Sequence, residues 1–275
     1  MKPFVKLLNF EINRFSRIYL VLILLTVICQ FTSVAWESSN MMDRAETVMR
    51  EKGLQADDFL KQSQPFYFSD IHNSLLFMAP IVIGICALLF YNFFIWYRDW
   101  FTGSPFIYRL LMIPVSRMKI FYAKTAALLL MVFGLIAFQM ILFPIEDGLF
   151  HILVPSDFRT SVPYSETLKS SLLLSLLVPE TFLEFILYYG IGIMLVLLLN
   201  TFILFERSFR WLGICMAFVF GLAAALILMI PFLLNQTGAR LYPSEIIYLQ
   251  IAAAACVALI SFMASRYLLQ KKITV

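Results

Sequence analysis

Five polar side chains inside long apolar stretches are the groups of this sequence that could do chemistry at membrane depth: Gln30, Asn92, Gln139, Glu184 and Asn200. An intramembrane protease or acyltransferase would need several of them to converge on one site. They are scattered over four stretches, which argues against such a site. Glu184 is the only acid among them, and it lies within one turn of the end of its stretch, where it can reach the interface. A proton-relay or substrate role for this possible intramembrane polar site stays open.

Other catalytic and ligand-binding motifs are absent. No Gly-Lys pair occurs, so the chain has no GxxxxGK[ST] nucleotide-binding loop, and it has no HExxH, GxSxG or CxxC. His72 and His151 have no companion ligands nearby and are interpreted as ordinary interfacial histidines. Four cysteines lie inside apolar stretches, where small packing residues are expected: Cys29, Cys86, Cys215 and Cys256. We therefore expect no catalytic residue, metal or cofactor.

The composition shows where these side chains must be positioned. Of the 275 residues, 61% are hydrophobic and 14% are charged, and the mean hydropathy is +0.87. Such a chain has too little polar surface for a soluble enzyme or a nucleic-acid-binding domain. Six stretches have the roughly 20 apolar residues that a membrane-crossing helix needs: 18–36, 75–97, 125–145, 182–205, 211–234 and 246–265. The sequence predicts an all-α, polytopic protein with a six-helix transmembrane domain over 18–265.

The charges predict the orientation. The segments 1–17, 98–124, 206–210 and 266–275 hold 14 basic residues and only three acids, which are Glu11, Asp99 and Glu206. The opposite segments 37–74, 146–181 and 235–245 hold seven basic residues and 13 acids. Cytoplasmic segments carry the excess of Lys and Arg. Both termini are therefore expected in the cytoplasm, with 266–275 as a tail, in a multi-pass membrane protein.

Residues 1–17 form a basic, amphipathic segment. Phe4, Leu8, Ile12 and Phe15 recur at helical spacing and share one face. Such a helix is expected to lie in the headgroup plane as a cytoplasmic interfacial helix. The alternative is that it extends the first span.

The segment 98–124 contains a second short amphipathic helix. Ser104 and Pro105 are a helix-start signal, and Pro114 is a stop signal. Phe106, Leu110 and Ile113 form an apolar stripe between them. Ser116 can cap the following helix, which begins with Arg117. This loop helix either binds a cytoplasmic partner or lies along the membrane interface.

Three further patterns predict local structure. A helix is plausible from about Met41 to Lys52 and would end at Gly53.

The apolar run 168–178 is too short to cross the membrane, so it is expected to lie at the outer membrane interface or to enter the membrane partway. In the fifth span, small residues repeat every four positions and predict close helix packing, in the same chain or in a partner: Gly213, Ala217, Gly221 and Ala225.

The segment 98–124 resembles the first cytoplasmic loop of type-2 ABC transporter permeases. That family commonly carries an acid, a Gly-Thr-like pair, Leu-Leu, Pro-x-Ser-Arg and then a Lys at the start of the third span. The matching residues are Asp99, Gly103-Ser104, Leu110-Leu111, Pro114-Val115-Ser116-Arg117 and Lys124. Asp99 replaces the usual Glu, and Ser104 replaces the usual Thr. The link 235–245 is shorter, and 146–181 longer, than in the best-known members.

The resemblance implies the transmembrane permease subunit of an ATP-driven ABC exporter, which is not itself an enzyme. Its partners would be a separate ATP-binding cassette subunit that hydrolyses ATP, a second permease subunit in a homo- or heterodimer, and membrane lipids, with no nucleic acid. The helix from Pro105 to Ile113 would be the coupling helix, with Arg109 on it, and the fifth-span stripe would lie near the dimer interface. The alternatives are an intramembrane enzyme and a non-transporting scaffold or sensor subunit.

Overall fold

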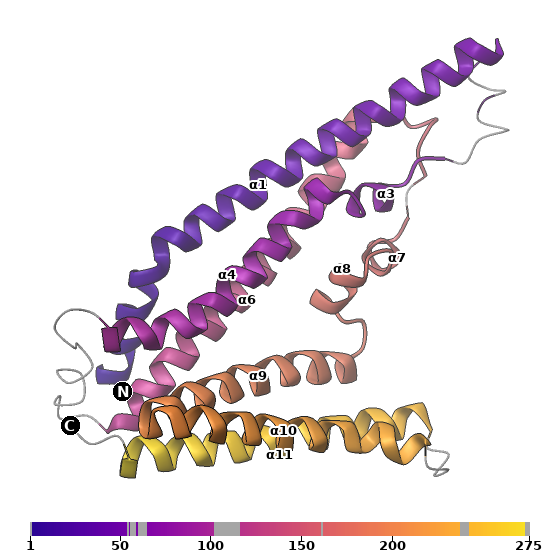
Figure 1. The fold of residues 1–275 in the computed structure, drawn as a ribbon. Coiled ribbons are helices and arrows are strands. Elements are labelled where there is room, and N and C mark those ends of the chain that lie inside the picture. Colours follow the sequence, from indigo (N-terminus) through magenta and orange to yellow (C-terminus); the bar gives the residue numbers. More distant parts are fainter. Residues whose placement is uncertain are drawn as a thin grey trace. The chain divides into compact units, whose positions relative to one another are not determined.

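The computed structural model describes residues 2–53, 55, 59, 65–101, 116–160, 162–236 and 242–272. Within these ranges the chain is helical without strands, apart from one isolated bridge between Phe66 and Arg159. The elements, shown in Figure 1, are α1 (Lys2–Lys52), α3 (Phe68–His72), α4 (Leu75–Phe101), α6 (Arg117–Leu153), α7 (Tyr164–Lys169), α8 (Leu172–Leu177), α9 (Phe182–Phe209), α10 (Trp211–Leu234), α11 (Pro243–Tyr267) and the π-helical turn η2 (Leu268–Lys272).

Six of these helices are long and apolar enough to cross a membrane: α1, α4, α6, α9, α10 and α11 with its continuation η2. Each of them contains one of the six predicted spans, which confirms the predicted all-α, six-span fold class. The chain is therefore a multi-pass helical membrane protein.

Two helices are much longer than a membrane is thick. The 51 residues of α1 rise about 76 Å and the 37 residues of α6 about 55 Å, against a hydrocarbon core of about 30 Å. The helix predicted over Met41–Lys52 is present as the last part of α1, and Gly53 follows it with a φ of +63°, as expected for a helix-ending glycine. Residues 2–17 are helical and continuous with the first span, and their place in the headgroup plane stays a prediction.

The described chain divides into two compact units. The first unit comprises 1–14, 88–130 and 181–275, and the second comprises 15–87 and 131–180. The long helices α1, α4 and α6 each contribute to both units. Each unit is described below by itself.

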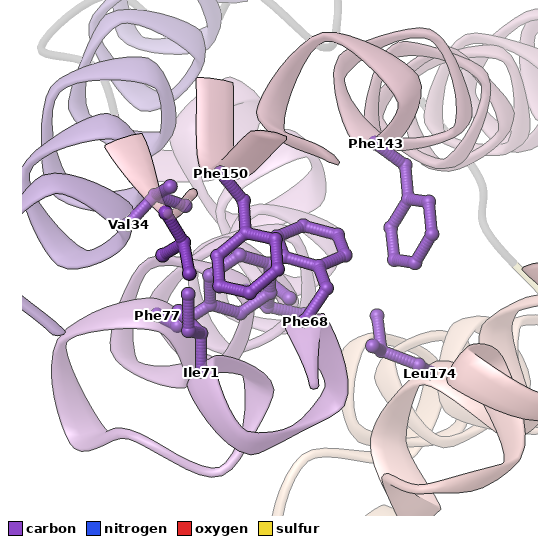
Figure 2. Packing of buried hydrophobic residues seen from close by; sticks show 9 residues of the cluster. Val34, Phe68, Ile71, Phe77, Phe143, Phe150 and Leu174 are labelled. Atoms are coloured by element: carbon purple, nitrogen blue, oxygen red, sulfur yellow. The ribbon is translucent and has the colours of Figure 1, made fainter. Parts of the chain in front are cut away.

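The second unit is organised by a cluster of aromatic and aliphatic side chains (Figure 2). Phe68 of the short helix α3 contacts Phe143 and Phe150 of α6, with ring centroids 5.5 and 5.7 Å apart. Leu174 of α8 is buried in the same cluster. The apolar run 168–178 forms the end of α7 and all of α8, with Ser170 and Ser171 between them. One side of the run is therefore buried in the protein.

In the first unit, α9, α10 and α11 pack together around Met194, Ala224, Ala254 and Val257. The hydroxyl of Thr201 on α9 donates to the carbonyl of Ser261 and is 2.9 Å from the hydroxyl oxygen of Ser265, both on α11. Hydroxyl bonds of this kind connect helices where no water can satisfy the polar groups.

The small-residue stripe of α10 makes contacts within the chain. A Cβ added to Gly213 would lie 2.1 Å from the backbone oxygen of Phe205, and one added to Gly221 would lie 3.0 Å from the ring of Phe202. Both partners belong to α9. The tight turn between the two helices brings the backbones this close, since only Arg210 separates them.

The other two stripe positions behave differently. Ala217 is half-buried and Ala225 is exposed, whereas its neighbour Ala224 is fully buried. The close approaches at Gly213 and Gly221 are made to α9 of the same chain. A role of the stripe in a dimer stays a prediction.

Candidate functional site

The first unit contains a group of five charged side chains, three of them buried and the two arginines partly exposed, which we call the charged cluster: Glu11, Arg14, Arg98, Asp99 and Lys124. They come from the beginning of α1, the end of α4 and the beginning of α6. The ammonium group of Lys124 is at the centre. It donates to Glu11 Oε1 at 2.7 Å, to Asp99 Oδ2 at 2.5 Å and to the carbonyl of Ile95 at 2.9 Å.

Two arginines complete the charged cluster. Arg14 Nη1 donates to Asp99 Oδ1 at 2.7 Å, and Arg98 Nη2 lies 3.6 Å from Glu11 Oε2. The cluster therefore holds two acids and three bases, with a net charge of +1. The hydroxyl of Tyr91 also donates to the carbonyl of Glu11, at 3.3 Å.

Burial makes these pairings energetically important. The side chain of Lys124 is 1% exposed and that of Asp99 is fully buried. An unpaired charge at such depth costs several kcal/mol, and an ammonium group has three protons to donate. All three of these protons have an acceptor here, and the ammonium also lies 5.5 Å from the centroid of the Trp96 ring. The charged cluster thus holds the ends of three helices in one arrangement.

A short chain of hydrogen bonds beside the charged cluster reaches α9. Trp96 Nε1 donates to Asn200 Oδ1 at 3.0 Å, and Asn200 Nδ2 donates to the hydroxyl of Thr125 at 3.1 Å. Asn200, one of the five polar candidates of the sequence, therefore connects α4 and α6 with α9.

The predicted loop residues are only partly described. Asp99 lies in the charged cluster. The carbonyl of Ser116 accepts from the backbone N–H of Lys119 at 2.8 Å, as the residue before a first helical turn does, and Arg117 Nη1 donates to the carbonyl of Leu269 at 3.1 Å. The remaining loop residues lie outside the described ranges: Gly103, Ser104, Pro105, Phe106, Arg109, Leu110, Ile113 and Pro114.

Glu184 lies at the beginning of α9, where it forms a capping box with Thr181. The Thr181 hydroxyl accepts from the backbone N–H of Glu184 at 3.2 Å, and Glu184 Oε2 accepts from the backbone N–H of Thr181 at 3.3 Å. These bonds satisfy two backbone donors at the helix end. Asn200 is 16 residues further along the same helix, which is about 24 Å. These two polar groups therefore do not converge on one site.

Among the described residues of the second unit, two ionisable side chains are buried. His72 is fully buried, stacks on Phe143 at 5.0 Å and has no hydrogen-bond partner at either ring nitrogen. Burial lowers the pKa of His72 to about 4. The interpretation of His72 as an ordinary interfacial histidine was wrong, because the aromatic cluster encloses it. Glu146 of α6 is likewise fully buried, and neither carboxylate oxygen has a hydrogen-bond partner.

Sequence reasoning missed the contribution of the N-terminal segment to the site. Glu11 and Arg14 bind Lys124 and Asp99, which are more than 80 residues away in the sequence. The sequence held one signal for these ion pairs: Glu11, Asp99 and Glu206 are the only acids on the predicted basic side. Each of them has a cationic partner in the structure. Glu11 and Asp99 lie in the charged cluster, and Glu206 Oε1 lies 3.7 Å from Arg207 Nη2.

The part of the chain that the structure describes contains no group of three His, Cys, Asp or Glu that could hold a metal ion. Comparisons with protein-family models, with curated proteins and with solved structures found no match. The fold and the charged cluster thus define a multi-pass helical membrane protein with a buried ion-pair network at three helix ends.

Proposed function

We propose that this chain is the transmembrane permease subunit of an ATP-driven exporter that moves a substrate across the cell membrane. The observation that carries this proposal is the charged cluster, which holds both ends of the segment 98–124. Asp99 lies two residues before the end of α4, and Lys124 lies two turns into α6. The ion pair between them joins the helices that enter and leave the loop.

This arrangement suits a loop that receives a mechanical input. A partner that displaces the segment Pro105–Ile113, for which the sequence predicts a helix, would act on the end of α4 and the beginning of α6. Because Lys124 binds both Asp99 and Glu11, the movement would pass to α4, α6 and the beginning of α1 together. The hydrogen bonds through Asn200 would extend it to α9. A buried ion-pair network resists bending of one helix alone, since separating its members exposes unpaired charges.

The remaining parts of the proposal come from the sequence. The chain has no nucleotide-binding loop, so ATP would be hydrolysed on a separate ATP-binding cassette subunit docked at 98–124. The excess of basic residues favours a cytoplasmic position for this loop and both termini. The resemblance to type-2 ABC permeases adds a second permease subunit and a bacterial cell membrane.

Co-purification tests the proposal. Full-length tagged chain, produced with the products of its neighbouring genes, is expected to recover an ATP-binding subunit whose ATPase activity it stimulates in lipid nanodiscs. Arg109→Glu is expected to weaken this recovery at least tenfold, because it reverses a charge on the proposed coupling helix. Arg266→Glu is the matched control, since Arg266 is an exposed arginine on the same predicted side but outside the loop.

The outcomes separate the three function classes. If no ATP-binding subunit is recovered, or if Arg109→Glu and Arg266→Glu behave alike, the permease proposal is wrong. A chemical activity of the purified chain without ATP would instead support an intramembrane enzyme. Partner binding without ATP-dependent substrate movement would support a scaffold or sensor subunit.

A further inference from the structure

The second unit contains a cavity of about 240 Å³ between the start of α3, the end of α6 and the segment that leads into α7. Four aromatic side chains line it: Tyr67, Phe68, Phe150 and Tyr164. Among the described residues that line it there is one acid, Asp147, and no lysine or arginine. The volume is slightly below the range of about 300–1,000 Å³ that is typical of drug-sized ligands, so the cavity suits a small one.

The carboxylate of Asp147 remains available to a cation. Its side chain is 19% exposed, so it is not sealed inside the protein. Its Oδ2 accepts a hydrogen bond from the hydroxyl of Tyr164 at 3.2 Å, and its Oδ1 lies 3.4 Å from His151 Nδ1. Within the described part of the chain no lysine or arginine forms an ion pair with it. Arg159 donates instead to the backbone carbonyls of His151 and Val154.

The aromatic side chains lie at two depths. Phe68 and Phe150 are buried, with ring centroids 5.7 Å apart, as Figure 2 shows from close by. Tyr67 is half-buried and Tyr164 is half-exposed, so these two lie nearer the surface. Aromatic rings attract cations, and recognition of quaternary ammonium groups is the usual function of several rings around one cavity.

The chemistry of the cavity favours a cation without N–H groups. A primary ammonium has three protons, each of which needs an acceptor when water is displaced. The two oxygens of Asp147 already have Tyr164 and His151 as neighbours. A quaternary ammonium has no proton to donate, so it needs only the negative charge and the rings.

The sequence also indicates where this cavity lies. Asp147 comes two residues after the predicted third span, and Tyr67 comes eight residues before the second. Both belong to the acidic segments that are predicted on the side opposite to the loop 98–124. We therefore expect the cavity at the level of the lipid headgroups on that side, where the excess of acids also attracts cations.

We propose that this cavity binds a small quaternary ammonium group, such as that of choline, through the charge of Asp147 and the aromatic rings around it. The same trimethylammonium group occurs in free choline and in the headgroup of phosphatidylcholine, and both are within reach of a site at the membrane surface. The proposal does not depend on the export function, since the cavity lies in the second unit and the charged cluster in the first.

Binding of radiolabelled choline tests the proposal. Full-length chain would be placed in nanodiscs of phosphatidylglycerol, which contains no choline, and bound label would be measured by scintillation proximity. We expect saturable binding. The alcohol 3,3-dimethyl-1-butanol has the shape of choline with carbon in place of the charged nitrogen, and it is expected to compete at least about tenfold more weakly than unlabelled choline. Equal competition by the two would show that the cavity recognises shape alone and would overturn the proposal.

Two variants of one chemical type test the role of the charge. Asp147→Asn keeps the shape and an acceptor for Tyr164, and it is expected to weaken choline binding about fivefold. Asp157→Asn is the matched control, because Asp157 is an exposed acid of the same unit that does not line the cavity. It is expected to leave binding within about twofold of the unchanged chain.

Two variants of Tyr164 test the role of the rings. Tyr164→Phe keeps the ring and removes the hydroxyl, so binding is expected to stay within about twofold. Tyr164→Leu keeps an apolar side chain without a ring, and it is expected to weaken binding about fourfold. Each variant is compared after it elutes as a single monodisperse species, so that misfolding is not mistaken for lost binding.

A change of lipid distinguishes the two sources of the ligand. If the headgroup occupies the cavity, nanodiscs of phosphatidylcholine should suppress the binding of free choline. If the site takes a free ammonium ion, the affinity should be the same in both lipids. Non-saturable binding to the unchanged chain in phosphatidylglycerol, or equal effects of Asp147→Asn and Asp157→Asn, would overturn the proposal.

Discussion

Replacing Lys124 with Met tests whether the charged cluster holds the first unit together. Methionine has a similar length and no charge, so the change removes the ammonium and keeps most of the packing. It deprives the carboxylates of Glu11 and Asp99 of their shared partner. Breaking a buried ion pair on one side costs about 3–5 kcal/mol. Arg14 and Arg98 remain beside the two acids and still offset part of their charge. We therefore expect a loss at the lower end of this range, about 3 kcal/mol.

The free energy of unfolding would be measured in mixed micelles with a rising fraction of denaturing detergent, followed by circular dichroism. Lys119→Met is the matched control, because Lys119 is an exposed lysine five residues earlier on the same helix. It is expected to change the free energy of unfolding by no more than about 0.5 kcal/mol. A loss below 1 kcal/mol for Lys124→Met, or a loss equal to that of Lys119→Met, would refute the reasoning.

A double-mutant cycle assigns the loss to the ion pair. Once Lys124 is Met, neutralising its partner by Asp99→Asn removes an acid that has already lost one of its two cations. The added cost of Asp99→Asn is therefore expected to be about 1–3 kcal/mol smaller than in the unchanged chain. Strict additivity of the two changes would show that the pair at 2.5 Å makes no specific contribution.

Three further outcomes are expected. Gly213→Ala should destabilise the chain by about 1–3 kcal/mol, because the new methyl group overlaps the backbone of α9, whereas Gly192→Ala, with open space around it, should not. Lowering the pH from 6.5 towards 4 should reduce the free energy of unfolding by up to about 3 kcal/mol through His72. The reason is that the unfolded histidine binds a proton in this range, whereas the buried one, with a pKa of about 4, does not. The variant His72→Phe should not show this loss in the same titration. Thr181→Ala should lower the free energy of unfolding by about 1 kcal/mol through loss of the capping box, and Glu184→Gln, which keeps an acceptor there, by less.

Detergent-induced unfolding measures all three. Equal effects of the two glycine changes would show that α9 and α10 can move apart at their turn without a loss of stability. An identical pH dependence with and without His72 would show that its burial does not control acid stability. A large loss of a measured activity in Glu184→Gln without a loss of stability would restore a functional role for that acid.

Much of the fold was predictable because its determinants are local. A membrane-crossing helix needs only length and apolar composition, and all six spans were found from those properties. Gly53 marked the end of α1 because a left-handed residue after a helix favours glycine. The continuity of α1 from Lys2 to Lys52 was less accessible, since the polar residues near both ends of this helix suggested separate elements.

The candidate site was only half predictable. The resemblance brought Asp99 and Lys124 together as members of one motif, and they form an ion pair. Glu11 lies 113 residues before Lys124, and helical periodicity shows which face a residue occupies but not which helix covers that face. The same limit applied to the glycine stripe, which predicted a close helix contact without naming α9 as the partner.

By itself, the sequence determined the six membrane-crossing helices and the absence of a GxxxxGK[ST] motif, because those properties follow from composition and from short motifs. Only the tertiary structure decided that Glu11 shares the ammonium of Lys124 with Asp99, that Glu184 caps a helix and that His72 is enclosed by aromatic rings. Each of these depends on distances between side chains on different elements or on the geometry of a helix end. Such distances are set by how helices pack, and packing depends on shape and burial that no single segment specifies.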